Sequence, residues 1–328
     1  MTALEAVRGE LAERRERLAS LAVTVRESQL VELLRQVDSA LERLDGGTWG
    51  RCAICLGSVE PDRLAADPLL TVCLECLSPS ERRALERDLE AAARVQAALL
   101  PPRQLRHDGW EVALLWQPLG VLSGDHYDLL RPSREDEPLH LVVGDVAGKG
   151  VSASLLQSHL HALLRALAAP DLSLAALLTR ANRLLCEVTL PASYATLLAA
   201  RLYPGGRVEL ASAGHPRPLL ADRRGVRPVE GAGLPLGLFC SADYATRDLH
   251  LAAGDTLLLY TDGWTEAATD AAGEFGIGRA AAVLRRVKDR PLADLLAACL
   301  GEMEEFLHGA PRQDDLTLLA LRRVAVAE

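Results

Sequence analysis

Four acidic positions stand out because each lies at or near the edge of a strand-like run. Asp145 ends the apolar run LHLVVGD, and Asp262 ends LLLYTD. Asp125 lies in SGDHYD, and Asp314 comes just before the strand-like DLTLLAL. An Asp-Gly pair such as Asp262-Gly263 is by itself usually a turn. Four carboxylates at separate strand edges, however, can gather oxygen ligands at one end of a sheet.

Such a cluster of carboxylates needs compensating positive charge, because acidic groups a few ångströms apart repel one another and raise each other's pKa. Oxygen ligands favour Mg²⁺ or Mn²⁺ over zinc. A pair of these ions about 3.5–4 Å apart is a standard device for hydrolysing phosphoesters. The sequence therefore predicts a two-metal hydrolytic site.

The segment GDVAGKG offers a rival, the phosphate-binding loop of nucleotide-binding proteins. Only three residues separate Gly144 from Gly148, and Lys149 is followed by Gly150. The nucleotide-binding motif needs four residues between its glycines and a Ser or Thr after the lysine. We therefore reject that interpretation.

A second set of chemically active residues is a group of cysteines. Two Cys-x2-Cys pairs, separated by 17 residues, comprise Cys52, Cys55, Cys73 and Cys76. This spacing is typical of a site in which four thiolates hold one tetrahedral zinc ion. Two disulfides or four unliganded thiols are the alternatives.

The remaining three of the seven cysteines stand singly in apolar surroundings. They are Cys186, Cys240 and Cys299. Free cysteine is among the most buried residue types. We expect these three side chains to be small buried hydrophobes.

Composition bounds the class of protein. The chain has 328 residues, 49% of them hydrophobic, so it can bury a large core and form more than one domain. Its net charge of −9 gives no global basic field that would attract nucleic acid or anionic lipid. No apolar run reaches the ~20 residues that span a bilayer, and the N-terminal stretch is charged. We expect a soluble cytoplasmic protein without membrane contact.

The sequence of residues 1–101 predicts helices on either side of the cysteine pairs. Residues 1–45 carry two leucine-rich series with different phase, which fit either a helical hairpin or one continuous rod. Residues 46–78 hold the cysteine pairs. Residues 79–101 form a linker helix, with Ser78 or Ser80 as its N-terminal cap and Pro101-Pro102 as its stop.

In residues 102–328 the sequence pattern changes to short β-type runs separated by turns. Helical stretches are expected at about 152–169, 173–189, 278–288 and 292–308. A hairpin signal at Pro204-Gly205-Gly206 favours antiparallel strand pairing. The expected fold class is therefore α+β.

The cysteine segment resembles a known family. From about residue 38 to 77 the sequence LERLDGGTWGRCAICLGSVEPDRLAADPLLTVCLEC is similar to the DksA/TraR-type zinc finger. The resemblance implies one structural Zn²⁺ held by the four cysteines. It also implies RNA polymerase as one partner class, although the long acidic-tipped coiled coil of that family is not evident.

A longer resemblance covers residues 91–323. The motifs ARVQAALLP, SGDHYDLL, VVGDVAGKGVSASLL, ASAGHPRPLL, GDTLLLYTDGWTEA and QDDLTLLALR resemble, in order, those of the PPM metal-dependent phosphatases of the SpoIIE/RsbU branch. The implied fold is a four-layer α/β/β/α antiparallel β-sandwich, and the implied activity removes phosphate from serine or threonine. The implied ligands of two Mn²⁺ or Mg²⁺ ions are Asp125, Asp145, Asp262, Asp314 and the carbonyl of Val146.

The same resemblance implies roles for neighbouring residues. Asp145 would bridge both ions, and Asp314 is preferred over Asp315 as the fourth carboxylate. Classical eukaryotic members have a histidine two residues after the bridging aspartate, where this chain has Ala147. The donor of the leaving-group proton therefore stays unassigned. Supporting or purely structural roles are expected for Asp128, His215 and Glu266. Lys149 is expected either to contact the substrate phosphate or to be a solvated loop lysine.

The resemblance also implies a biological setting. The substrate would be a phosphorylated anti-sigma-factor antagonist of the STAS type, and the N-terminal helices would form a homodimer that controls activity through the helix before the domain. The alternative is a catalytically weak or inactive scaffold whose zinc finger binds RNA polymerase or another regulator.

Overall fold

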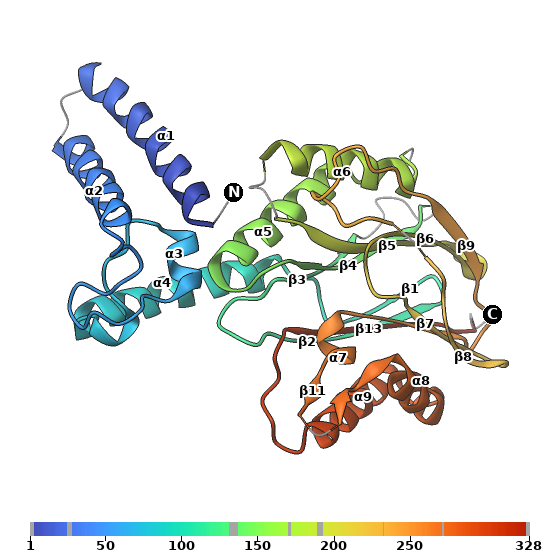
Figure 1. Ribbon diagram of the computed structural model, residues 1–328. Coiled ribbons are helices and arrows are strands. Elements are labelled where there is room, and N and C mark those ends of the chain that lie inside the picture. Colours follow the sequence, from blue (N-terminus) through green and yellow to red (C-terminus); the bar gives the residue numbers. More distant parts are fainter. Residues whose placement is uncertain are drawn as a thin grey trace. The chain divides into compact units, whose positions relative to one another are not determined.

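The computed structural model describes residues 3–24, 28–130, 137–169, 172–188, 193–231, 233–270 and 272–325 (Figure 1). The chain divides into two compact units, Met1–Leu89 and Glu90–Glu328. The division falls inside helix α4 (Pro79–Leu99). Within the described ranges, no helix has the length and hydropathy needed to span a membrane.

The first unit begins with a helical hairpin. Helix α1 (Ala3–Thr24) contacts helix α2 (Ser28–Asp45), and Leu11 of α1 is fully buried between them. Arg15 Nε donates to Asp38 Oδ1 across the pair at 2.5 Å. These contacts decide between the two predicted arrangements in favour of the hairpin.

Two short helices and the start of α4 complete the first unit. Helix α3 (Pro61–Ala66) precedes the second cysteine pair, and the 3-10 helix η1 (Leu74–Cys76) follows Cys73 and contains Cys76. The N–H of Ser78 donates to Glu81 Oε2 at 2.9 Å, and the N–H of Glu81 donates back to Ser78 Oγ at 3.3 Å. This reciprocal pair is a capping box. It identifies Ser78 as the cap that starts α4.

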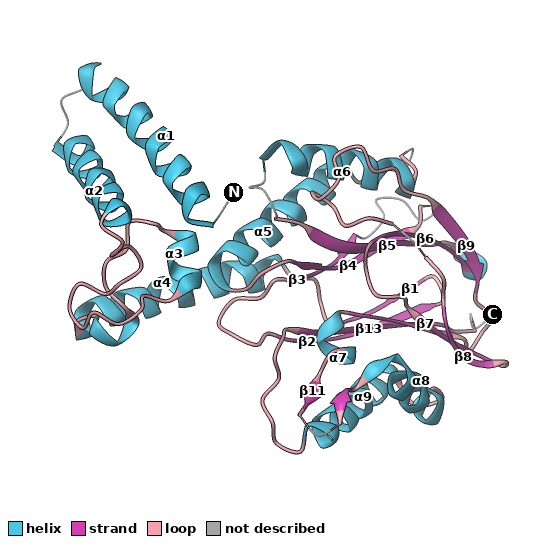
Figure 2. Cartoon of the chain, viewed as in Figure 1, coloured by secondary structure: helices cyan, strands magenta, loops and turns pink. Residues whose placement is uncertain are grey.

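The second unit is built on two antiparallel sheets (Figure 2). Over the described residues, the first sheet has the order β1 (Gln104–His107), β2 (Trp110–Gln117), β13 (Leu316–Arg323), β10 (Thr256–Tyr260), β7 (Leu219–Asp222) and β8 (Gly225–Pro228). The second has the order β3 (Asp125–Leu130), β4 (Leu139–Val146), β5 (Ala195–Leu202), β6 (Arg207–Ala213) and β9 (Thr246–His250). A short ribbon pairs β11 (Ala268–Thr269) with β12 (Gly273–Glu274).

Helices cover the outer faces of these sheets and make four layers. Helices α5 (Gly150–Leu167) and α6 (Leu174–Val188) pack on the second sheet, whereas α8 (Gly276–Val287) and α9 (Leu292–Leu307) pack on the first. A central core of leucine, valine and aromatic side chains fills the space between the sheets. Strands such as β10 are buried on both faces, which explains their unbroken apolar sequences. The predicted α/β/β/α sandwich is confirmed.

The predicted helices and hairpin lie close to their expected positions. All four helices of the sandwich start and end within two residues of the predicted ranges. Strands β5 and β6 pair antiparallel around the 3-10 turn η2 (Pro204–Gly206), as the Pro-Gly-Gly signal predicts. Local pattern therefore identified these elements well.

The prediction for the single cysteines was wrong for two of the three. Cys299 is fully buried, as expected. Cys240 is exposed, however, and is joined by a disulfide to the half-buried Cys186 of α6. Apolar neighbours in sequence did not reveal this partner because it is 54 residues away.

Candidate active site

The first two candidate carboxylates are direct neighbours across a strand pair. Asp125 opens β3 and stands opposite Asp145, which is near the end of β4. A Cβ at the preceding Gly124 would lie 3.0 Å from the carbonyl oxygen of Val146 and 3.4 Å from Asp145 Oδ1. The absence of a side chain there lets the backbone pass close to both groups.

The other two carboxylates come from the first sheet. Strands β10 and β13 pair as far as Tyr260 and Leu318, and the N–H of Thr261 donates to the carbonyl of Thr317 at 3.0 Å. Asp262 therefore follows β10 into the short helix α7 (Asp262–Thr265), and Asp314 precedes β13 at the same end. The strand LLLY stops on Asp262 because its pairing partner begins here.

Electrostatic repulsion links these groups. Burial raises the pKa of Asp145 to about 8, and the negative charges of Asp262, Asp314 and Asp315 add to that shift. Burial, followed by the charge of Asp145, also raises the pKa of Asp125 well above its usual value. Burial and then Asp314 raise the pKa of Asp262. The carboxylates therefore lie close enough to destabilise one another's charge.

Asp125 is held by two hydroxyl groups that sequence analysis missed. Thr261 Oγ1 donates to Asp125 Oδ2 at 2.9 Å, and Thr317 Oγ1 donates to the same oxygen at 2.5 Å. Both threonines are fully buried. They belong to the opposite sheet, so no local pattern could have identified them.

Asp314 and Asp315 have different surroundings. Both oxygens of Asp315 accept backbone N–H groups, from Leu119 at 2.6 Å and from Gly124 at 2.8 Å. Asp314 instead lies 3.1 Å from the half-exposed Lys149 Nζ. Asp315 thus fastens the loop before β3 to the start of β13, whereas Asp314 faces a half-exposed cation.

The other residues noted in the sequence have mainly structural contacts. Asp128 is buried and accepts two hydrogen bonds from Arg165, at 2.7 and 2.8 Å. His215 is buried next to Thr196, with 2.9 Å between Nδ1 and Oγ1, and burial lowers its pKa to about 3. The side chain of Glu266 is exposed, while its N–H donates to the carbonyl of Asp262 at 2.7 Å.

Gln96 of α4 is a further positioning residue that the sequence did not single out. Its Nε2 donates to the carbonyl of Ser123 at 2.8 Å, and its Oε1 accepts the N–H of Ser123 at 3.1 Å. Ser123 Oγ in turn accepts the N–H of Asp125 at 3.1 Å. A buried amide on the helix thus fixes the backbone two residues before a candidate ligand.

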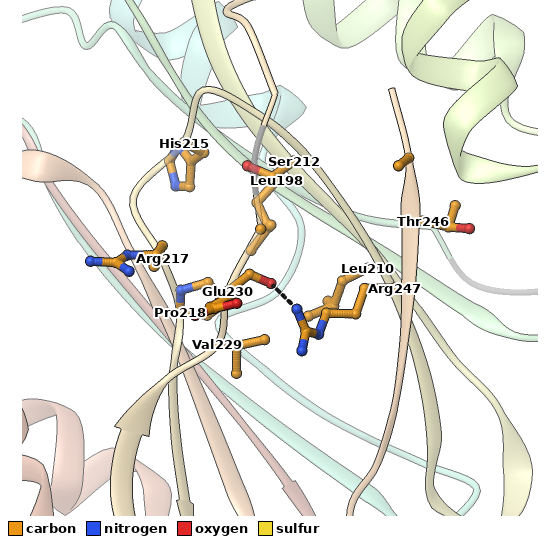
Figure 3. Close-up of a pocket in the computed structure, with 12 residues that line it drawn as sticks. Leu198, Leu210, Ser212, His215, Arg217, Pro218, Val229, Glu230, Thr246 and Arg247 are labelled. Carbon is orange, nitrogen blue, oxygen red and sulfur yellow. Dashed lines mark hydrogen bonds between the residues drawn. The ribbon is translucent and has the colours of Figure 1, made fainter. Parts of the chain in front are cut away.

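The second unit also has a cavity of about 290 Å³ (Figure 3). Leu198, Leu210 and Val229 form its apolar part, and His215 and Arg247 are among its polar lining residues. None of the four candidate carboxylates is among the described residues that line it. The cavity is therefore not the place where phosphate chemistry is expected.

The cysteine cluster lies in the first unit. All four sulfurs are within 4.8 Å of one another, and Cys55 Sγ is 3.7 Å from Cys73 Sγ. Sulfurs bound at about 2.3 Å to one tetrahedral ion are about 3.8 Å apart. Backbone N–H groups, first that of Cys55, lower the pKa of Cys52 to about 6, whereas the neighbouring Cys73 and Cys55 thiols raise that of Cys76 to about 12. The donor set and its spacing fit one zinc ion.

The carboxylates are spread more widely. Over the described part of the chain, the cysteine sulfurs are the one group of three or more candidate ligands that lie within 4.8 Å of one another. A pair of ions about 3.5–4 Å apart needs a wider set of ligands than a single ion does. Oxygen donors on two facing sheets fit such a pair of hard cations.

Comparison with known proteins decides the family. The model of the Stage II sporulation protein E (SpoIIE) family matches residues 135–324, which is more than half of the chain. The chain belongs to the SpoIIE family.

Two relatives match this chain over about half of their own length. Phosphoserine phosphatase RsbU of Bacillus subtilis is 26% identical over 189 residues, which cover 57% of this chain and 56% of RsbU. Protein IcfG of Synechocystis is 23% identical over 265 residues, covering 72% of this chain and 41% of IcfG. The chain thus spans about half the length of these relatives.

Solved structures agree on the fold. The SiaA-PP2C domain of Pseudomonas aeruginosa has a TM-score of 0.66 and 25% identity, covering 75% of this chain and 99% of that domain. The RsbU and RsbW domains of a Mycobacterium tuberculosis protein give a TM-score of 0.59 and 30% identity, covering 70% of this chain and 63% of that one. The second unit therefore has the PP2C fold.

Proposed function

We propose that this SpoIIE-family chain is a metal-dependent protein phosphatase that removes phosphate from serine or threonine of a regulatory protein. The observation that carries the proposal is the direct pairing of Asp125 with Asp145, at the end of the sandwich where Asp262 and Asp314 also lie. The likeness to phosphoserine phosphatase RsbU supports the same activity.

Two Mn²⁺ or Mg²⁺ ions would be held by Asp125, Asp145, Asp262, Asp314 and the carbonyl of Val146. When bound, such ions supply Lewis acidity toward phosphoryl oxygen and lower the pKa of bound water. Because backbone amides occupy both oxygens of Asp315, its neighbour Asp314 is the better candidate ligand.

The chain's own residues would do the positioning. Thr261 and Thr317 fix the rotation of the Asp125 carboxylate through Oδ2. The half-exposed Lys149 can exchange its contact with Asp314 for one with a substrate phosphate. Ala147 cannot donate a proton to the leaving serine or threonine oxygen, and we propose that this proton comes from solvent or from the substrate protein.

Hydrolysis of p-nitrophenyl phosphate with Mn²⁺ tests the activity. Asp145→Ala and Asp262→Ala are expected to lower kcat/KM by more than about 100-fold, beyond the effect of residues that only orient a ligand. Asp289→Ala, at an exposed position, is the control. Equal rates in all four proteins would refute the proposed site. No hydrolysis by the wild type with either metal would favour the scaffold alternative.

The proposed substrate is a phosphorylated anti-sigma-factor antagonist of the STAS type, acting in partner-switching control of transcription. The motif resemblance supports this class, and the name of RsbU as a phosphoserine phosphatase supports phosphoserine as the group removed. Release of phosphate from a phosphoserine-bearing STAS protein, compared with the same protein phosphorylated on histidine, tests it. Similar rates on both would contradict the proposed selectivity.

We further propose that Cys52, Cys55, Cys73 and Cys76 bind one structural zinc ion. The 3.7 Å sulfur separation and the burial of Cys52 and Cys73 support this proposal. Elemental analysis is expected to find one zinc per chain in the wild type and none in Cys73→Ser. A strong chelator should also disrupt the packing around Trp49, which lies beside this cluster, before it affects the packing around the tryptophans of the other unit.

Dimerisation through the N-terminal helices is the proposed means of control. The α1–α2 hairpin leaves Leu4 and Val31 exposed at 55% and 58%, which supports a role for it in association. Gel filtration of the full chain and of residues 79–328 compares their oligomeric states. An unchanged oligomer with unchanged activity would exclude this mode of control, and direct binding to RNA polymerase would then become the next test.

A further inference from the structure

Two of the seven cysteines are placed differently from the rest. Four sulfurs form the cluster in the first unit, and Cys299 is buried among apolar side chains that raise its pKa to about 12. A thiol in such surroundings is unreactive. Cys240 is exposed and Cys186 half-buried, so oxidants in solution can reach this pair.

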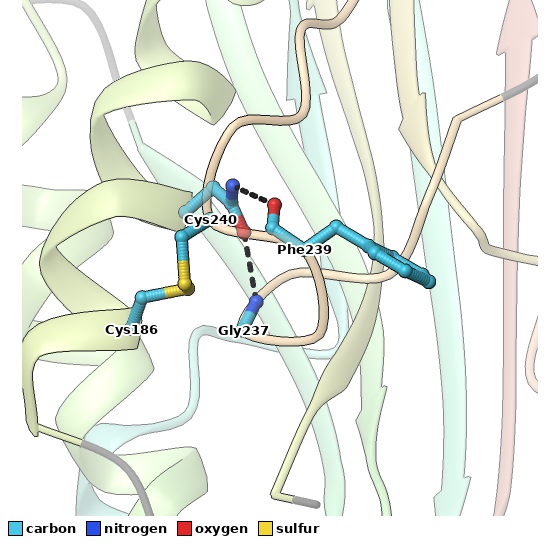
Figure 4. The surroundings of a disulfide bond; sticks show 5 residues. Cys186, Gly237, Phe239 and Cys240 are labelled. Atoms are coloured by element: carbon cyan, nitrogen blue, oxygen red, sulfur yellow. Dashed lines mark hydrogen bonds between the residues drawn. A yellow bond between two sulfur atoms is a disulfide. The ribbon is translucent and has the colours of Figure 1, made fainter. Parts of the chain in front are cut away.

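The two residues are also correctly spaced for a crosslink. Cys186 lies near the C-terminal end of α6, and Cys240 lies in the loop of residues 233–241, here called the LPLG loop. Their Cα atoms are 5.8 Å apart and a disulfide joins them (Figure 4). This separation is inside the range of about 4.4–6.8 Å that disulfides require.

A second attachment holds the same loop to the same helix. Asn182 Nδ2 donates to the carbonyl of Phe239 at 2.8 Å, and Asn182 Oδ1 accepts the N–H of Gly237 at 2.8 Å. Asn182 is fully buried and lies one helical turn before Cys186. The loop therefore stays on α6 through hydrogen bonds even when the cysteines are reduced.

The other side of the LPLG loop contacts the strands that carry the candidate active site. Leu236 exchanges two backbone hydrogen bonds with Ala195, at 2.8 and 2.9 Å, and Ala195 stands opposite Val146 of β4. Gly237 has a φ of +87°, and a Cβ there would lie 3.0 Å from the carbonyl of Ser193. The loop thus connects α6 with the start of β5, one strand from Asp145.

The tip of the loop is exposed to solvent. Leu238 and Phe239 expose 43% and 49% of their side chains, although they are large and apolar. Both lie between the attachment at Gly237 and the crosslink at Cys240. A crosslink at Cys240 therefore adds a covalent restraint at this end of the tip. Its loss leaves this end held by hydrogen bonds alone, among them the one from Asn182 to the Phe239 carbonyl.

We propose that Cys186 and Cys240 are a site of reversible thiol oxidation, which fastens the LPLG loop to α6 when oxidised and releases its tip when reduced. The proposal does not depend on phosphatase activity. Oxidation of this cysteine pair would make the side of the second sheet that carries Asp145 responsive to oxidants. Disulfides in reducing compartments are usually of this transient, sensing kind.

The chemistry balances with a peroxide as oxidant. The exposed Cys240 thiolate attacks one oxygen of hydrogen peroxide, which forms a sulfenic acid and releases hydroxide. The Cys186 thiol then displaces the sulfenic oxygen as water, and the S–S bond forms. The sum converts two thiols and one peroxide into one disulfide and two waters. A dithiol reductant reverses the step by exchange through a mixed disulfide.

The test uses the full chain. Protein reduced with dithiothreitol and then freed of reductant is titrated with hydrogen peroxide, and peptides containing Cys186 and Cys240 are followed by mass spectrometry after alkylation. We expect the crosslinked peptide pair to appear, and to disappear on renewed reduction. This readout is specific for the pair, so oxidation within the cysteine cluster does not interfere.

Limited digestion with chymotrypsin measures the effect on the loop. Cleavage after Phe239 requires local opening of the chain, and we expect it to be about 10-fold slower in the oxidised protein than in the reduced one. Cys186→Ser and Cys240→Ser should both cleave at the reduced rate with or without peroxide. Cys299→Ser is the matched control and should keep the redox difference.

Two results would overturn the proposal. One is the absence of the crosslinked peptide pair at every peroxide concentration that leaves the circular dichroism spectrum unchanged. The other is a crosslink that forms but leaves cleavage after Phe239 at the same rate. Because Cys240 is exposed, Cys240→Ser keeps the test valid even where Cys186→Ser fails to fold.

Discussion

Replacement of Gln96 with alanine should release the backbone that positions Asp125. The Gln96 carboxamide makes two hydrogen bonds to Ser123, at 2.8 and 3.1 Å, and both residues are nearly or fully buried. Each bond contributes about 0.5–1.5 kcal/mol net, and each buried group left without a partner costs about 1–3 kcal/mol. Some water will enter the space left by the side chain, so we expect a loss of about 2–4 kcal/mol in local stability.

Hydrogen exchange gives the sharpest assay of this loss. A change of about 1.4 kcal/mol is tenfold in an opening equilibrium, so the amides of residues 119–126 should exchange about 30- to 1,000-fold faster in Gln96→Ala. Gln96→Glu keeps an acceptor for the Ser123 N–H but loses the donor, and should give an intermediate rate. Val95→Ala, which alters a neighbouring side chain that is 63% exposed, is the matched control.

The result that would refute this reasoning is equal exchange in Gln96→Ala and Val95→Ala. Such a result would mean that other contacts, such as those of Asp315 with Leu119 and Gly124, hold the loop without help from α4. Faster exchange confined to residues 119–126, with the rest of the sandwich unchanged, would instead confirm that Gln96 acts locally.

Three further predictions concern an ion pair, a hydroxyl group and a histidine. Arg165→Ala removes both guanidinium hydrogen bonds of the buried Asp128, which keeps the N–H of Leu129 as a donor, and should lower the free energy of unfolding by about 3 kcal/mol. Urea denaturation measured against Arg285→Ala checks this. The value is at the low end for a buried pair because the Arg165 side chain is 46% exposed. Thr317→Val removes one of the hydroxyls on Asp125 and should weaken Mn²⁺ binding about 10–100-fold by calorimetry, whereas Thr246→Val on β9 should not. Burial lowers the pKa of His140 from 6.5 to about 4, so the unfolded chain binds the extra proton between these values and stability falls as pH is lowered through that window. His140→Gln should therefore reduce the pH slope of the unfolding free energy there, by at most about 1.4 kcal/mol per pH unit, and an unchanged slope would contradict the assignment.

The sequence alone determined the secondary-structure elements and the residues whose side chains could take part in chemistry. Apolar runs such as that of Leu257 to Tyr260 predicted strands, and the structure places β10 there with all its residues buried. Acidic residues at the ends of those runs were identified as candidate ligands. The strand prediction succeeds because burial imposes a short-range period on the chain, and strand ends are marked by a change in residue type. The assignment of the acidic residues as ligands stays a prediction.

The tertiary structure alone decided which polar groups are partners. Gln96 and Ser123 are 27 residues apart, Asp125 and Thr317 are 192 apart, and Cys186 and Cys240 are 54 apart. It also chose the hairpin over the rod for the N-terminal helices, through Leu11 and the Arg15–Asp38 pair. A glutamine, threonine or cysteine has the same local appearance whether its partner is water or a distant strand. Only the packing of the sheets and helices removes the water and leaves one partner within hydrogen-bonding reach.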